Sequence, residues 1–136
     1  MIGIVIVAHG GLAREYLAAV EHVVGHQDDV RTVAIHPDDD RAAKQAEICA
    51  AADAVDQGQG VVIVTDMFGG SPSNLSLRAC GPDDRRILYG ANLPMLIKLA
   101  KSRSKSVGDA VAASLAAGRK YIDSHAVDDE MGLKWG

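Results

Sequence analysis

The stretch Ile2-Gly-Ile-Val-Ile-Val-Ala8, followed by His9-Gly10-Gly11, decides how this chain folds. An uncharged run rich in β-branched side chains predicts a strand that is buried on both faces, as in a parallel sheet. A second run, Val61-Val-Ile-Val-Thr65, has the same character and is followed by Asp66. Each run therefore ends in a reactive side chain at its carboxyl end, where open α/β sheets bind their ligands.

The composition is that of an ordinary globular domain. The 136 residues are 48% hydrophobic and 24% charged, so we expect one domain over residues 1–136 with a core of its own. A net charge of −4 gives no basic surface for nucleic acid or an anionic membrane. There is no apolar run of ~18 residues to span a membrane, and no basic region typical of a signal peptide.

The two cysteines, Cys49 and Cys80, lack the spacing of metal ligands. Two such thiols are typical of reduced, buried cysteines, so we expect the protein in the cytoplasm. Nothing in the sequence predicts a metal or a cofactor.

Helical and extended patterns alternate along the chain. We expect a doubly wound α/β fold with a mostly parallel sheet in the order 2-1-3-4. The helix after the first strand should turn Leu12, Tyr16, Ala19, Val20 and Val23 towards the core. The other predicted elements are a strand over 30–35 near the sheet edge, a helix from a cap at 38–40 to about 56, a helix over 73–80, a strand over 86–90, helices over 92–102 and 106–124, and a last strand on which Met131, Leu133 and Trp135 alternate.

In this strand order, His9 and Asp66 face each other at the switch point of the sheet. A carboxylate that accepts a hydrogen bond from one ring nitrogen fixes the tautomer and leaves the other nitrogen free to attack. It also stabilises the ring once that nitrogen is phosphorylated. The pair therefore predicts phosphoryl transfer through a phosphohistidine.

Glycine-rich turns adjoin both residues. Gly69, Gly70 and Ser71 lead into a predicted helix, and Gly10 stands at the start of another. Backbone N–H groups at a helix start favour an anion, and the Ser71 hydroxyl adds a donor. We expect these residues to hold the phosphoryl group.

Each of these features taken alone is more often structural than catalytic; their convergence at one edge is the argument for function. The remaining histidines carry less weight. His22 and His26 are four residues apart without a third ligand, and His36 and His125 are expected at the surface. A basic stretch, Lys98, Lys101, Arg103 and Lys105, fits a helix end that complements the helix dipole.

Three motifs, at 4–13, 65–74 and 90–96, resemble the IIA component of the mannose family of the bacterial sugar phosphotransferase system. The resemblance covers nearly the whole chain. It implies that His9 accepts a phosphoryl group from HPr and passes it to a IIB partner, that Asp66 hydrogen-bonds His9, and that Ser71 contacts the phosphoryl group. It also implies a loop beside the site at Asn92–Met95, and a homodimer with a C-terminal edge strand swapped between subunits.

Several alternatives stay open. Because the sequence ends at Gly136 without a IIB segment, we expect a free-standing IIA that serves transport or regulation. The phosphoryl donor subunit of dihydroxyacetone kinase carries a related domain, and a non-catalytic domain could keep the fold. A response-regulator receiver would need an acidic pair where His9 stands, and a histidine phosphatase would need an arginine in place of Ala8. The sugar cannot be read, because specificity belongs to the partners.

Overall fold

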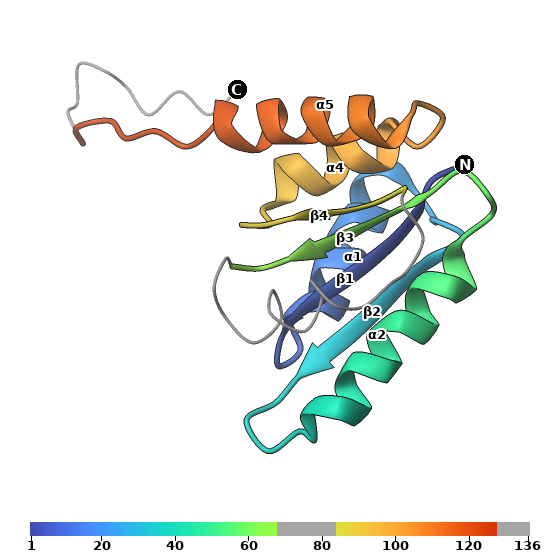
Figure 1. Cartoon of the computed structure of the whole chain (residues 1–136). Coiled ribbons are helices and arrows are strands. Elements are labelled where there is room, and N and C mark those ends of the chain that lie inside the picture. The colour runs from blue at the N-terminus through green and yellow to red at the C-terminus, as the bar shows by residue number, and fades with distance from the viewer. Residues whose placement is uncertain (68–83, 128–136) are drawn as a thin grey trace.

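The computed structural model describes residues 1–67 and 84–127, which form an α/β fold (Figure 1). The predicted helix over 73–80, the turn at 69–71 and the predicted strand near 131–135 lie outside the described residues. The strands are β1 (Gly3–His9), β2 (Val30–Ile35), β3 (Val61–Thr65) and β4 (Arg85–Leu88), and the helices are α1 (Leu12–Val24), α2 (Arg41–Val55), α4 (Leu93–Lys101) and α5 (Val107–Lys120).

The four described strands form one all-parallel sheet in the order β2-β1-β3-β4. The predicted fold class and strand order are confirmed. In the register of β1 with β3, Val7 lies opposite Thr65. The two strands therefore end at the same edge of the sheet, and so do the residues that follow them.

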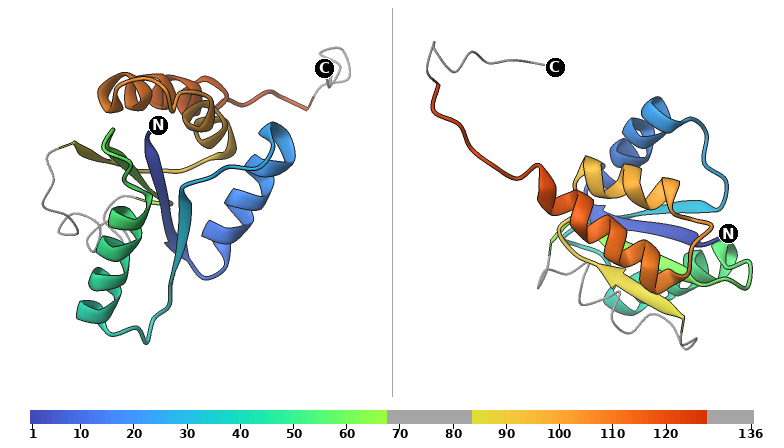
Figure 2. Two further views of the ribbon diagram at one scale, coloured as in Figure 1. Left: turned by 90° about the vertical axis from the view of Figure 1, so that its right-hand side faces the viewer. Right: turned by 90° about the horizontal axis from the view of Figure 1, so that it is seen from above.

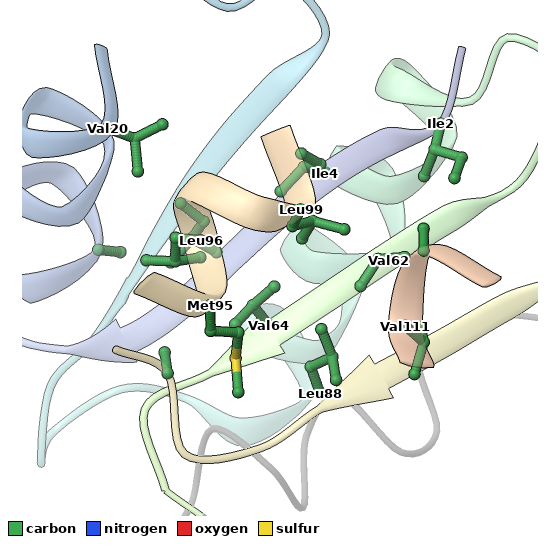
Figure 3. Close-up of a cluster of buried hydrophobic side chains, with 14 of the residues drawn as sticks. Ile2, Ile4, Val20, Val62, Val64, Leu88, Met95, Leu96, Leu99 and Val111 are labelled. Carbon is green, nitrogen blue, oxygen red and sulfur yellow. The ribbon is translucent and has the colours of Figure 1, made fainter. Parts of the chain in front are cut away.

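Helices cover both faces of the sheet, which explains the uninterrupted apolar runs. In β1, Ile4 and Ile6 belong to the core shared with α1, α4 and α5, whereas Val5 and Val7 pack in the core under α2. Figure 2 shows α2 on one side of the sheet and the other three helices on the opposite side. A close-up of the larger core has Val64 of β3 beside Met95 of α4 (Figure 3). Burial on both faces leaves polar side chains room only at the strand ends.

Side-chain caps place the helix starts as the sequence predicts. The Asp40 carboxylate accepts from the Ala43 N–H at 3.1 Å, the Asn92 side chain from Met95 at 3.0 Å, and the Ser106 hydroxyl from Asp109 at 3.1 Å. Each satisfies a donor that the first helical turn would otherwise leave unpaired.

The buried face of α1 agrees with the predicted one at Tyr16 and Val20 but differs from it at Leu12 and Val23. Leu12 and Val23 are exposed by 39% and 54%, while Ala13 and Val20 are buried and Leu17 and Val24 pack on the core beside Tyr16. The apolar residues of α1 extend around more than one face, so spacing alone left its rotation open. Contact with the sheet selects the face that carries the small Ala13.

The end of α5 was also predicted wrongly, since the helix stops at Lys120 rather than near 124. A Cβ on Gly118 would lie 3.1 Å from the Met95 Cβ, so this glycine lets the last turns approach α4 closely. Beyond it, Ile122 and Val127 are exposed by 73% and 89%. Helices of this length depend on tertiary packing, and α5 ends where that packing ends.

Arg103, predicted as part of a basic stretch that complements a helix dipole, is buried to 4% exposure. Its Nε donates to the Ile2 carbonyl at 2.8 Å, its Nη2 to the Asp29 carbonyl at 3.0 Å and its Nη1 to Gln27 at 3.3 Å. Burial lowers the pKa of its guanidinium, against the opposing charges of Asp29 and Asp28. The side chain thereby links the start of β1 to the connection that leads into β2.

Within residues 1–67 and 84–127, none of the helices has the length and hydropathy that a bilayer crossing requires.

We predict that Arg103→Ala lowers the free energy of unfolding by about 2–4 kcal/mol, because it removes the side-chain donor of the buried Ile2 carbonyl and one of the two donors of the Asp29 carbonyl. Lys105 is an exposed residue of the connection between α4 and α5, which also contains Arg103. Lys105→Ala should change the free energy of unfolding by less than about 0.5 kcal/mol. Urea denaturation of both variants is the measurement. Equal stabilities would contradict a structural role for the guanidinium.

Candidate functional site

His9 and Asp66 form a hydrogen-bonded pair at the carboxyl edge of β1 and β3. The His9 ring Nδ1 lies 2.9 Å from Asp66 Oδ2, and the His9 main-chain N–H donates to the same oxygen at 3.1 Å. A carboxylate can only accept, so Nδ1 carries the proton and Nε2 holds the free lone pair. The sequence analysis predicted that these two residues, 57 positions apart in the chain, lie close together at the ends of neighbouring strands.

The two partners differ in exposure. The Asp66 side chain is 10% exposed, whereas that of His9 is 50% exposed. A carboxylate in a less polar surrounding interacts more strongly with its partner than it would in water. The half-exposed ring, in contrast, stays open to a second molecule. The arrangement presents an oriented imidazole to solvent.

The backbone after His9 turns sharply into α1. Gly10 has φ +56, a left-handed conformation that glycine adopts without strain, and its N–H donates to the Ile35 carbonyl at 2.9 Å. Gly11 is the N-cap of α1 and contributes no side-chain cap. The first N–H groups of α1 therefore follow His9 closely in the chain, and no side chain of the described residues caps them. The expected contact of Gly10 with a phosphoryl group stays a prediction.

Among the described residues, Asp66 is held through one oxygen only. Its Oδ2 receives both donors from His9, while its buried Oδ1 has no hydrogen-bond partner among the described residues. Thr65, immediately before it, is fully buried, and its hydroxyl lies 3.5 Å from the Leu88 carbonyl. The direction of the carboxylate thus follows closely from the placement of the main chain at the end of β3.

Tyr16 lies near the His9–Asp66 pair, which the sequence analysis did not predict, because it placed Tyr16 only on an apolar helix face. Its hydroxyl donates to the Ala91 carbonyl at 3.0 Å, and the Ala91 N–H donates to the Thr65 carbonyl at 3.0 Å. Burial raises the pKa of Tyr16, and the negative charge of Asp66 raises it further. A hydroxyl on the inward face of a helix that begins at a strand end is the signal that could have indicated it.

Asn92, the residue after Ala91, has a structural role that joins α4 to α5. Besides capping α4, its side-chain amide donates to the Gly118 carbonyl of α5 at 2.9 Å. It therefore fixes the segment that begins with Ala91, next to the end of β3.

The other candidate residues are placed as follows. Ser71, Gly69 and Gly70 lie outside the described residues, so their expected contact with a phosphoryl group stays a prediction. His26 pairs with the Glu21 and Asp28 carboxylates at 3.1 and 3.0 Å. In the described ranges, no three His, Cys, Asp or Glu side chains are grouped as a metal site.

A groove of about 550 Å³ lies between α4 and α5, away from the His9–Asp66 pair. Alanine side chains and Ile97 line it, and its charged residues are Lys98, Lys101 and Lys120. Two of these lysines stand in the last turn of α4, where they complement the helix dipole as expected.

Fold and site together define an open-sheet α/β protein with an oriented histidine at its switch point. The profile of the EIIA-man family, described as "PTS system fructose IIA component", matches residues 3–116. The chain belongs to this family, which confirms the resemblance seen in the three motifs, and it is a mannose-family IIA component of the phosphotransferase system.

Individual relatives agree with this assignment. The mannose-specific EIIAB component of Escherichia coli K12 is 29% identical over 124 residues, which are 89% of this chain but 38% of that protein. The chain thus spans well under half the length of this relative.

Solved structures of similar proteins include a mannose/sorbose specific IIA subunit from Enterococcus faecalis, with TM-score 0.82 and 25% identity over 93% of this chain and 96% of that one. Another is a PTS IIA protein associated with the fucose utilization operon of Streptococcus pneumoniae, with TM-score 0.76 and 29% identity over 89% and 91%. In each case the matched region makes up nearly all of the solved chain, so the fold of this chain is similar to that of both proteins.

The electrostatic link between Asp66 and Tyr16 can be measured. We predict that Asp66→Asn lowers the pKa of Tyr16, because it removes the negative charge and leaves burial as the remaining cause of the upward shift. Alkaline titration of tyrosinate absorbance, with the Tyr16→Phe protein subtracted, isolates this group. An unchanged Tyr16 titration would mean that the carboxylate does not act on the phenol.

Proposed function

We propose that this chain is a phosphocarrier: His9 accepts a phosphoryl group from the phosphohistidine of HPr and passes it to a separate IIB-type partner, in sugar uptake or in regulation. The observation that carries the proposal is the 2.9 Å contact between His9 Nδ1 and Asp66 Oδ2. That contact leaves Nε2 as the nucleophile on a ring that is half exposed to a partner. Family membership supports the same reading.

The transfer is a displacement between two imidazoles. The lone pair of His9 Nε2 attacks the phosphorus of the donor's phosphohistidine, and the donor's N–P bond breaks with its electron pair returning to the donor ring. The proton on Nδ1 stays in place, and the Asp66 carboxylate compensates the positive charge that the His9 ring gains. The reverse sequence at a IIB partner restores the free ring.

The phosphoryl oxygens need donors of their own. We assign this role to the N–H groups that follow the Gly10 turn at the start of α1, since the N–H of Gly10 itself bonds the Ile35 carbonyl. We also assign it to Gly69, Gly70 and the Ser71 hydroxyl, because helix starts and glycine-rich turns bind such anions. No metal or cofactor enters this mechanism. We further propose that the chain acts as one domain, as a homodimer and in the cytoplasm.

The proposal predicts that incubation with phosphoenolpyruvate, enzyme I and HPr adds one phosphoryl group to the protein, and that His9→Ala abolishes this gain. The bound phosphate should survive alkali, because phosphohistidine is stable in base and an acyl phosphate is not. Intact-mass spectrometry before and after alkaline treatment is the measurement.

His22→Ala is the matched control for that experiment, since His22 is an exposed histidine on α1. It should load as the wild-type protein does. Loading of His9→Ala, or alkali-labile phosphate, would place the phosphoryl group elsewhere. No loading of the wild-type protein by several HPr proteins would indicate a non-catalytic domain.

We predict that Asp66→Asn slows phosphoryl transfer about 10- to 100-fold, the range of a charge-assisted hydrogen bond lost from the transition state. The domain should remain folded, because the asparagine keeps the shape of the side chain. Rapid-quench measurement of transfer from phospho-HPr gives the rate, and circular dichroism checks the fold. A wild-type rate would remove Asp66 from the mechanism.

A further inference from the structure

The hydroxyl of Tyr16 connects α1, which follows His9, with the end of β3, which carries Asp66, through hydrogen bonds to Ala91. Tyr16 stands on the second turn of α1, the helix that follows His9 and its glycine turn. Its side chain packs against the core shared by α1, α4 and α5. From there its hydroxyl reaches the Ala91 carbonyl, 75 positions further along the chain.

Ala91 is held from two directions. Its carbonyl accepts from Tyr16 at 3.0 Å, and its N–H donates to the Thr65 carbonyl at 3.0 Å. Thr65 is the residue before Asp66. A hydrogen-bonded path thus leads from α1 through Ala91 to the end of β3, and it closes a ring with the direct contact between His9 and Asp66.

This ring matters because, in the part of the chain that the structure describes, little else orients the carboxylate. Asp66 Oδ1 is buried and unpartnered in the described part of the chain, so only the two donors from His9 hold the group directly. A carboxylate fixed through one oxygen depends on the position of its own main chain. That main chain is coupled to α1 through Ala91 and Tyr16.

We propose that Tyr16 is a positioning residue for phosphoryl transfer: its hydroxyl keeps the end of β3 aligned with the turn after His9, so that Asp66 holds the His9 ring in the Nδ1–H tautomer. The inference deepens the proposed function and rests on it. Tyr16 itself touches neither the reacting nitrogen nor the phosphoryl group.

The chemistry of the phenol suits this role. Burial and the charge of Asp66 both raise its pKa, so the hydroxyl stays protonated wherever an imidazole titrates. It therefore remains a hydrogen-bond donor to Ala91 throughout the transfer and does not take part in proton transfer.

Tyr16→Phe tests the proposal, because it removes the hydroxyl and keeps the ring that packs in the core. We expect the Nδ1–H tautomer fraction of His9, read from imidazole ¹⁵N chemical shifts, to fall in the free protein. We expect kcat for transfer from phospho-HPr to fall about 3- to 10-fold with KM unchanged, as for one hydrogen bond lost from an oriented site.

Ser114→Ala is the matched control. It also removes one buried hydroxyl, whose bond goes to the Ala110 carbonyl at 2.7 Å within α5, and it should leave the His9 tautomer and kcat at wild-type values. Both variants are compared well below their unfolding temperatures, so that a loss of stability alone does not alter either reading.

The outcomes separate the two proposals. An unchanged tautomer fraction and unchanged kcat in Tyr16→Phe would overturn the positioning role, even if the variant were less stable. A changed tautomer fraction in Tyr16→Phe, together with a wild-type protein that HPr does not load, would keep the positioning of the His9 ring by Tyr16 and reject phosphoryl transfer. A rise in KM alone would also overturn the inference, because it would place Tyr16 in partner binding.

Discussion

The in-register parallel pairing of β1 with β3 is the constraint on which the rest of the structure depends. It sets Val7 opposite Thr65 and thereby brings His9 and Asp66 to hydrogen-bonding distance at one edge. A register shift of two residues would move the carboxylate by about 6–7 Å and break that contact. The apolar packing that fixes the register therefore also fixes the geometry of the site. The orientation of His9 and Asp66 thus depends on the packing of the core.

The sheet order and the His9–Asp66 pair could be predicted because their signals are local. An uninterrupted apolar strand must be covered on both faces, which requires helices between parallel strands. The first polar residue after such a strand must lie at its edge, and neighbouring strands bring two of these residues together. Neither step needs knowledge of which side chain meets which across the core.

The roles of Tyr16 and Arg103 could not be predicted for the opposite reason. Each side chain bonds a main-chain carbonyl far away in the sequence, Ala91 at 75 positions and Ile2 at 101 positions. Periodicity tells on which face of a helix a residue stands, but it does not tell which carbonyl lies opposite. The basic neighbours of Arg103 favoured a role at a helix end, and the apolar neighbours of Tyr16 favoured a role in the core alone.

The unequal burial of the pair bears on how a carrier works. A carrier must hold its phosphoryl group firmly enough to accept it and loosely enough to give it away, so the loaded and free states need similar free energies. In the proposed mechanism, the 10% exposed Asp66 strengthens the interaction with a ring that would become positive on phosphorylation. The 50% exposure of His9 limits that gain, because water screens the same charge. A fully buried pair would trap the phosphoryl group, whereas a fully exposed pair would lose control of the tautomer.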